Sequence, residues 1–183
     1  MEPIEVGPPL ITSDQIQQRV GELAAEINAN YKDTDRPLSV ITVLKGACFF
    51  AVDLLRHIEV ITHIDFVQAS SYLGGLTSSG EVRLHTDISM PISGTDVLLL
   101  EDIVDTGLTA SWLMRHLSSH NPASVRLCSL LDKPSGRREQ VEIHYTGFVI
   151  PDEFVLGYGL DYGEAYRNLP AIYVARAISG ASR

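Results

Sequence analysis

One segment of the sequence, residues 97–110, combines residue types that could bind a phosphorylated sugar. Its apolar start ends in two adjacent carboxylates, Glu101 and Asp102, and carboxylates suit sugar hydroxyls or Mg²⁺. The turn that follows offers hydroxyl groups, a glycine and the free backbone N–H groups of a helix start, which together suit a phosphate. Because acidic groups repel an anion, we expect the carboxylates and the turn to contact different parts of one ligand.

Familiar nucleotide-binding motifs do not account for this segment. The sequence contains neither G-x-x-x-x-G-K-[ST] nor G-x-G-x-x-G after a strand, so the signatures of P-loop hydrolysis and of dinucleotide binding are missing. The alternative without a ligand is an acidic, threonine-capped helix start. Two acids at the end of a buried strand favour the ligand site, because open α/β sheets bind ligands at the carboxyl ends of their strands.

The rest of the chain alternates helix and strand patterns that would position this segment. A capping box at 12–15 precedes an apolar helical face that runs to Ile27. A second helix, with its apolar residues between Phe49 and Leu55, follows the strand at 38–44. A third runs to about His116 from the turn at 105–109, which we call the phosphate turn. Strands are predicted at 38–44, 60–69, 96–102, 124–131, 148–150, 155–158 and 172–175. This alternation predicts an α/β fold with a mainly parallel sheet, in a single domain over residues 1–183.

The bulk composition excludes several classes of function. The chain has 183 residues, 45% of them hydrophobic and 20% charged, as in a soluble globular protein. Its net charge of -9 argues against broad electrostatic binding to nucleic acid or to an anionic membrane. Because no apolar run reaches membrane-spanning length and the start carries no targeting pattern, we expect a cytoplasmic protein. Cys48 and Cys128 are interpreted as buried small hydrophobic residues.

Residues 97–110 resemble the phosphoribosyl-diphosphate binding signature of type I phosphoribosyltransferases, and further motifs extend the resemblance to the hypoxanthine-guanine phosphoribosyltransferases. Those motifs are Lys45-Gly46-Ala47 after a strand, Ser71-Tyr72 at the start of a serine- and glycine-rich loop, Asp132-Lys133 after a strand, PDEFVLGY at 151–158, Asp161-Tyr162 and Arg167. The resemblance covers roughly residues 38–167. It implies a type I phosphoribosyltransferase fold, with a mainly parallel central sheet flanked by helices and a small hood built from the N- and C-terminal segments.

The resemblance implies a purine salvage reaction. The 5-phosphoribosyl group would pass from phosphoribosyl diphosphate to N9 of hypoxanthine or guanine, giving IMP or GMP and pyrophosphate. Because the leaving group is highly charged, we expect catalysis to rest on Mg²⁺ and fixed donors rather than on a covalent nucleophile. By resemblance, Glu101 and Asp102 bind the ribose hydroxyls and their Mg²⁺. The 5′-phosphate would lie on the turn and helix start made by Asp105, Thr106, Gly107, Leu108 and Thr109.

The implied contacts to the purine come from four further positions and from Asp105. Asp105 would be the general base, or hydrogen-bond acceptor, for the N7 proton. Lys133 would contact O6 and favour 6-oxo over 6-amino purines, because an ammonium group cannot accept a hydrogen bond from an amino group. Phe154 would stack on the base and Val155 would offer a backbone carbonyl to its edge. Asp161 would hold a second Mg²⁺ beside the base.

The implied pyrophosphate contacts are Lys45, Gly46 and Arg167, and in the family the peptide after this lysine can be cis. Ser71 and Tyr72 would close over the reacting centre and exclude water, as the composition of the loop between 70 and 80 allows. The resemblance also implies a homodimer or homotetramer. Two other functions stay open: a regulatory protein that senses a nucleotide on the same fold, and an enzyme that prefers xanthine.

Several of these residues also have a plain structural interpretation. Lys133 before Pro134 could form only a charged turn, Phe154 could be a core residue, Arg167 a surface cation, and Asp161 part of a turn. Their joint order along the chain favours the functional interpretation.

One histidine pair has a spacing that also occurs in zinc sites. His116 and His120 are four residues apart on the helix after the phosphate turn. Because the sequence shows no third ligand, we interpret both as solvated side chains. Trp112, on the same helix, is interpreted as a packing residue.

Overall fold

The computed structural model describes residues 4–71 and 82–177. Strands and helices follow one another in near alternation, in the order β1 (Ile4–Ile11), α1 (Ser13–Tyr31), β2 (Leu38–Leu44), α2 (Cys48–Leu55), β3 (Thr62–Ser71), β4 (Val82–Thr86), β5 (Asp96–Val104), α3 (Leu108–Ser118), β6 (Ser124–Asp132), a 3₁₀ turn η1 (Pro134–Gly136), β7 (Tyr145–Val149), β8 (Val155–Leu156) and β9 (Ile172–Ala177).

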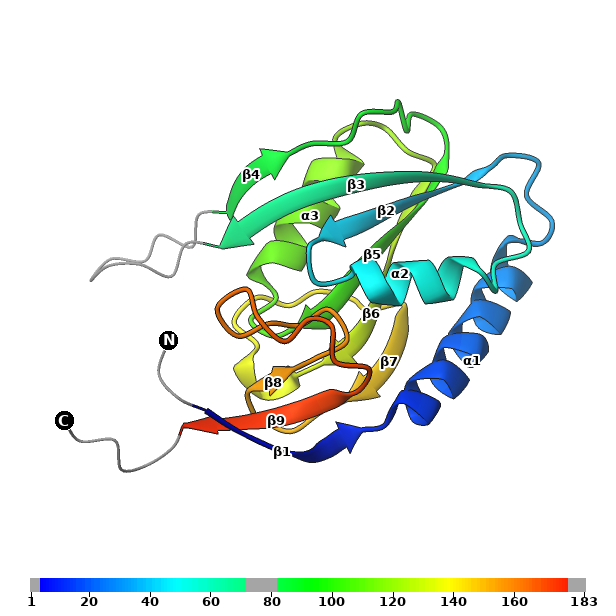
Figure 1. Ribbon diagram of the computed structural model, residues 1–183. Helices are drawn as coiled ribbons and strands as arrows, with labels where there is room; N and C mark the ends of the chain where they lie inside the picture. The colour runs from blue at the N-terminus through cyan, green and yellow to red at the C-terminus, as the bar shows by residue number, and fades with distance from the viewer. Residues whose placement is uncertain (1–3, 72–81, 178–183) are drawn as a thin grey trace.

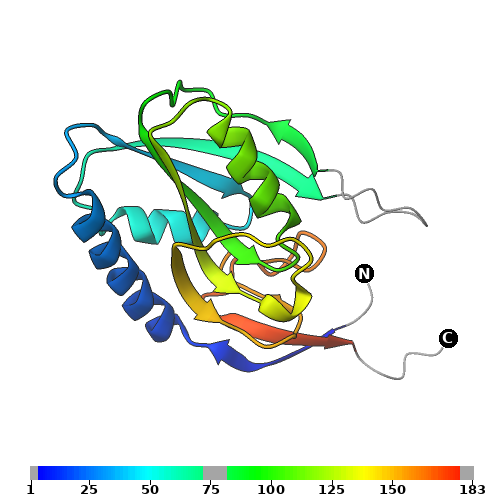
Figure 2. The ribbon, with the colours of Figure 1, turned by 180° about the vertical axis from the view of Figure 1, so that it is seen from behind.

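The main sheet contains six strands in the order β4-β3-β2-β5-β6-β7. All pairings in it are parallel except that of β4, which runs antiparallel to β3. Figures 1 and 2 show α1 and α2 on one face of this sheet and α3 on the other. The predicted mainly parallel α/β sheet flanked by helices is therefore confirmed.

The central strand β5 explains how one apolar run supports both faces. Successive strand side chains point to opposite faces, so the run Val97 to Leu100 supplies two layers. Leu98 and Leu100 join the core that α1 and α2 cover, whereas Val97 and Leu99 join the core under α3. All of these side chains are fully buried.

The first helix begins as its sequence predicts. Thr12 Oγ1 accepts a hydrogen bond from the Gln15 N–H at 3.3 Å, and Gln15 Oε1 accepts one from the Thr12 N–H at 2.9 Å. A cap of this kind contributes about 1 kcal/mol to stability. The apolar face then packs on the sheet through Ile16, Val20, Leu23, Ala24, Ile27 and Tyr31.

The two ends of the chain form a second, smaller sheet. Strand β9 pairs antiparallel with β1 on one side and with β8 on the other. This sheet lies beside the part of the main sheet that contains β6 and β7 (Figure 1). It corresponds to the predicted hood of N- and C-terminal segments. Strand β1 itself was not among the predicted elements, because its Gly-Pro-Pro centre disguises a strand in the sequence.

Three expectations need correction or fall outside the described residues. Strand β5 does not end at Glu101 and Asp102 but continues to Val104, because its pairing with β6 continues that far. Cys48 is exposed rather than buried, since it opens α2 on the solvent side, whereas Cys128 is buried as predicted. Tyr72 and the loop after it lie outside the described residues, and Ser71 ends β3. Among the described residues, no helix is both long and apolar enough to cross a membrane.

Candidate active site

A cavity of about 460 Å³ opens at the carboxyl ends of β2 and β5. The segment that follows β8, drawn in orange in Figure 1, folds back over these strand ends. The cavity gathers polar and charged side chains from regions far apart in the sequence: Lys45, Gln68, Ser70, Glu101, Asp102, Thr109, Asp161, Glu164 and Arg167. Much of the predicted site therefore meets in one place, at the sheet edge where α/β proteins bind ligands.

The two adjacent carboxylates of β5 lie in surroundings that disfavour their charge. Glu101 is only 4% exposed. Burial raises the pKa of Glu101 well above its ordinary value, and repulsion from Asp102 adds to the effect. Burial also raises the pKa of Asp102 to about 6, although the Ile103 N–H donates to its Oδ1 at 3.0 Å. Both carboxylates therefore favour a ligand that brings positive charge or hydroxyl donors.

The turn after β2 is pressed between β5 and the segment after β8. A Cβ on Gly46 would stand 1.6 Å from Asp102 Oδ2, so a larger residue there would displace the Asp102 carboxylate. Gly159, with a φ of +102°, approaches from the other side, and a Cβ on it would stand 2.0 Å from the Gly46 carbonyl oxygen. The cis peptide bond joins Leu44 to Lys45, one bond before the position that the resemblance suggested.

Cations and anions alternate along the opposite wall of the cavity. Arg167 Nη2 lies 2.8 Å from Asp161 Oδ1, and its Nη1 donates to the Gly159 carbonyl at 2.7 Å. Among the described residues, Arg167 Nε is buried without a hydrogen-bond partner. Lys45 Nζ lies 2.7 Å from Glu164 Oε2, and this hydrogen bond lowers the pKa of Glu164. Arg167 is thus a cavity residue, as predicted, and not a free surface cation.

Glu164 is a cavity residue that the sequence analysis missed. Its side chain forms ion pairs with Lys45 and with Arg167, whose Nη2 lies 3.3 Å from Glu164 Oε1. Its backbone N–H donates a hydrogen bond to Asp161 Oδ2 at 2.8 Å. The only sequence signal was its place one residue after the Asp-Tyr-Gly turn. Asp161 directly precedes a turn at 162–165, and it lines the cavity together with Glu164 of that turn.

The predicted phosphate turn encloses a smaller cavity of about 190 Å³, whose lining includes Asp105, Thr106, Gly107 and Thr109. Gly107 has a φ of +82°, a backbone conformation that other residues rarely adopt, and Leu108 begins α3 directly after it. The Thr106 carbonyl accepts hydrogen bonds from the N–H groups of Arg138 and Glu139 at 2.9 and 3.0 Å. The turn is therefore held by the segment at 138–139 as well as by the start of α3.

Asp105 and Lys133 form an ion pair at the end of this turn. Lys133 Nζ lies 2.8 Å from Asp105 Oδ2 and 3.4 Å from Asp152 Oδ1. The hydrogen bond to Asp105 raises the pKa of Lys133, so the side chain stays an ammonium. Gly136 leaves room for this arrangement, because a Cβ on it would stand 1.8 Å from Asp105 Oδ1. Lys133 is therefore more than a charged turn residue.

The two remaining purine candidates differ in exposure. Phe154 is 53% exposed and meets Tyr162 edge to face, with ring centroids 5.9 Å apart. It is therefore not a core residue, and about half of its side chain is exposed. Val155 is buried in the main core and pairs with Val174 of β9. Its side chain is structural, so any contact to a base must come from its backbone.

Arg137 is a second residue near the site that the sequence analysis did not single out. Its Nε donates to the Asp105 carbonyl at 3.0 Å and its Nη2 donates to the Val104 carbonyl at 3.1 Å. Nη2 also pairs with Asp132 Oδ1. One guanidinium thus joins the end of β6 to the start of the phosphate turn. Nothing in the sequence distinguishes it from Arg138, because the difference arises from the path of the turn after η1.

Comparison with known proteins gives consistent results. Residues 12–163 match the family model described as phosphoribosyl transferase domain. The hypoxanthine-guanine phosphoribosyltransferase of Mycobacterium avium is 51% identical over 167 residues, which are 89% of this chain and 82% of the relative. The enzyme of the same name from Bacillus subtilis is 46% identical, over 91% and 92% of the two chains. A crystal structure of a hypoxanthine-guanine phosphoribosyltransferase from Bacillus anthracis superposes with a TM-score of 0.87 at 42% identity, over 95% and 99% of the two chains.

Proposed function

The chain belongs to the phosphoribosyl transferase family, and from this premise we propose that it transfers the 5-phosphoribosyl group of phosphoribosyl diphosphate to N9 of hypoxanthine or guanine, with release of pyrophosphate. The enzyme class and the type I phosphoribosyltransferase fold, both predicted from motifs, are confirmed by the family match and the superposition. The choice of base and the role of each residue are our proposal.

The observation that carries the choice of base is the pairing of Asp105 with Lys133. A carboxylate oxygen and an ammonium nitrogen stand 2.8 Å apart at the mouth of the phosphate turn. On a 6-oxopurine, O6 and N7 are neighbouring groups on one edge, so an acceptor and a donor side by side match N7–H and O6. Asp105 would take or hold the N7 proton while Lys133 donates to O6. Adenine would turn an amino group toward the ammonium, and two donors cannot pair.

Separate regions of the cleft suit the other parts of the substrate. The phosphate turn, with its backbone N–H groups and hydroxyls at Thr106 and Thr109, suits the 5′-phosphate. The wall made by Lys45, Gly46 and Arg167 suits the pyrophosphate, and the unpartnered Nε of Arg167 supports this assignment because it leaves one donor unused. Glu101 and Asp102 suit the ribose hydroxyls between these two regions.

The cleft also fits the Mg²⁺ that such a reaction requires. Glu101, Asp102 and Asp161 are hard oxygen donors that line one cavity, and Asp161 raises the pKa of Asp102 as a nearby like charge does. A dication held by these carboxylates would remove the cost of keeping their charges buried. When bound, Mg²⁺ would neutralise negative charge on the leaving group. The chain's own residues would hold the sugar and orient the base for attack at C1.

We extend the proposal to the assignments that rest on the family alone. Phe154 stacks on the base, Val155 offers its backbone carbonyl, and Ser71 and Tyr72 close over the reacting centre. The chain acts as a single domain in a homodimer or homotetramer, in the cytoplasm, with no nucleic acid or membrane as partner. Net charge of -9 and the absence of a membrane-spanning helix among the described residues are compatible with this setting.

An assay of nucleotide formation tests the proposal. Purified protein is incubated with phosphoribosyl diphosphate, Mg²⁺ and hypoxanthine, guanine, xanthine or adenine. We expect product with hypoxanthine or guanine and none with adenine. Lys133→Gln should lower kcat/KM by about 10- to 100-fold, the cost of one hydrogen bond to a charged group, while the exposed Lys32→Gln changes nothing. No product with any base would refute the transfer reaction, and product with xanthine alone would support the xanthine alternative.

A further inference from the structure

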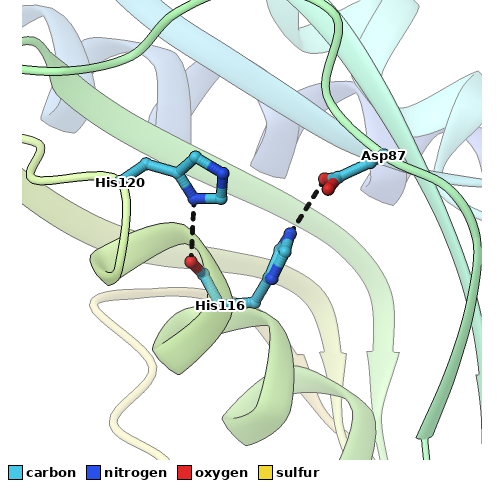
Figure 3. A group of neighbouring side chains, drawn as sticks. All are labelled: Asp87, His116 and His120. Atoms are coloured by element: carbon cyan, nitrogen blue, oxygen red, sulfur yellow. Dashed lines mark hydrogen bonds and ion pairs between the residues drawn. The ribbon is translucent and has the colours of Figure 1, made fainter.

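Three side chains that could bind a metal ion meet outside the cleft, between the end of α3 and the segment after β4. His116 lies in the last turn of α3, His120 lies just beyond its end, and Asp87 follows β4 (Figure 3). None of them lines the active-site cavity. The sequence alone showed two histidines without a third ligand, and the fold supplies it from a position 29 residues before His116.

The three groups lie within reach of one ion. Asp87 Oδ1 is 2.8 Å from His116 Nε2, and one ligand atom from each residue lies within 4.8 Å of the others. Zinc bonds to imidazole nitrogen and carboxylate oxygen are about 2.0 to 2.2 Å long, so tetrahedral ligand atoms stand roughly 3.3 Å apart. Small side-chain rotations, with release to solvent of the proton in the Asp87–His116 hydrogen bond, would therefore bring all three groups onto one ion.

The hydrogen bonding of His120 orients it as a ligand. Its Nδ1 lies 3.0 Å from the carbonyl oxygen of His116, and a carbonyl only accepts, so Nδ1 carries the proton. Nε2 of the neutral ring then presents a lone pair, and Figure 3 shows this nitrogen on the side of the ring toward Asp87 and the His116 imidazole. Metal-binding histidines commonly donate their second N–H to a carbonyl in this way.

The His116 ring is also held in place. Trp112, one turn earlier on α3, stacks on it with ring centroids 5.0 Å apart and an interplanar angle of 10°. Trp112 in turn packs against the core under α3, as its predicted packing role requires. The side chain of His116 is 20% exposed and that of Asp87 is 42% exposed, so the group is ordered yet open to solvent.

We propose that Asp87, His116 and His120 bind a divalent transition metal ion, with Zn²⁺ as the fitting example, at a site separate from the active cleft. Two imidazoles and one carboxylate suit Zn²⁺ and its neighbours in the transition series, whereas Mg²⁺ prefers oxygen ligands. A fourth position is left for water. The ion ties the segment after β4 to the end of α3, and α3 begins at the phosphate turn. The alternative is an Asp87–His116 hydrogen bond that serves packing alone.

Calorimetric titration with Zn²⁺ tests the site on the metal-stripped full chain. Millimolar Mg²⁺ is included so that the oxygen ligands of the cleft compete little for Zn²⁺. We expect one high-affinity Zn²⁺ per chain. His116→Ala and His120→Ala should each weaken it by at least about 100-fold, since even partners behind the ligands contribute 10- to 100-fold. The exposed His57→Ala is the matched control and should leave the affinity unchanged.

Two further measurements keep the test decisive. Trp112 is the only tryptophan of the chain, so Zn²⁺ at His116 should change its fluorescence with the same midpoint as the calorimetric titration. Zn²⁺ should also raise the thermal midpoint of the wild type and not that of His120→Gln, which keeps a polar side chain should an alanine variant fail to fold. Absence of Zn²⁺ binding to the wild type, or undiminished binding to both folded histidine variants, would overturn the site. Transfer activity plays no part in these readouts, so their failure would leave the proposed function standing.

Discussion

At the scale of single residues, the cleft combines groups whose charges would be unfavourable in isolation. The carboxylate of Asp105 is 40% exposed and paired with Lys133, whereas Glu101 is almost fully buried. Their surroundings suit them to different roles. Asp105 can exchange a proton with a ligand, while Glu101 and Asp102 can bind a cation or accept hydrogen bonds from hydroxyl groups. Two of the chain's three lysines, Lys45 and Lys133, lie in ion pairs with acids of this region.

The role of Asp105 gives the prediction at this scale. Asp105→Asn keeps the size of the side chain but removes its ability to take the N7 proton, so kcat should fall by about 10²- to 10⁴-fold with a much smaller change in KM. Steady-state kinetics with hypoxanthine measures both. Asp35→Asn, at an exposed position outside the cleft, serves as the control. An equal loss in kcat and in affinity would assign Asp105 to binding instead.

At the scale of elements, the site depends on segments that hold one another in register. Arg137 joins the end of β6 to the start of the phosphate turn through the carbonyls of Val104 and Asp105 and the carboxylate of Asp132. Gly46 and Gly159 similarly let the turn after β2 and the segment after β8 approach without side chains between them. The position of Asp105 is therefore a property of the packed turns and not of its own strand alone.

The bracing by Arg137 leads to a prediction for these elements. Lysine at this position keeps the charge but cannot reproduce the planar fork, so Arg137→Lys should lose at least two of the three contacts. We expect a loss of about 2 to 4 kcal/mol in the free energy of unfolding, measured by urea denaturation, and a lower kcat. The exposed neighbour Arg138→Lys is the control and should change the unfolding free energy by less than about 0.5 kcal/mol. Equal behaviour of the two variants would show that the bracing contributes nothing.

At the scale of the whole molecule, the substrate-free protein carries an electrostatic cost in its cleft. The folded-state pKa of Asp102 is raised to about 6, and that of Glu101 is raised as well. Unfolded aspartate titrates near pH 4, so between about pH 4 and 6 the native state binds more protons than the unfolded state. The free energy of unfolding therefore falls as pH rises through this window, as far as these two groups are concerned.

The difference between the wild type and Asp102→Asn isolates this effect from other titrations. Without Mg²⁺, the variant should resemble the wild type near pH 3, below both pKa values, and be more stable by about 1 to 3 kcal/mol at pH 8, because each pKa unit corresponds to about 1.4 kcal/mol. Urea denaturation in the presence of a chelator at both pH values measures the difference. A stability difference that does not change with pH, or a less stable variant at pH 8, would contradict the prediction.

Local patterns were sufficient wherever neighbouring residues decide the structure. The capping box, the continuous apolar run of β5 and the glycine turn before α3 predicted their elements, because each reflects hydrogen bonding or apolar character within a few residues. Strand β1 and the true end of β5 were missed, since both depend on pairing with distant strands, β9 and β6. The exposure of Cys48 was likewise set by which side of α2 faces the sheet.

The sequence by itself determined most of the order of elements, the residue types available for chemistry and the family to which they point. Only the tertiary structure decided which of those residues meet: Asp161 with Arg167, Lys133 with Asp105, Lys45 with the unforeseen Glu164, and Asp87 with two histidines read as solvated. The physical reason is that a side chain's hydrogen bonds and pKa depend on groups within a few ångströms. In this fold such groups come from strand ends and turns that are far apart along the chain.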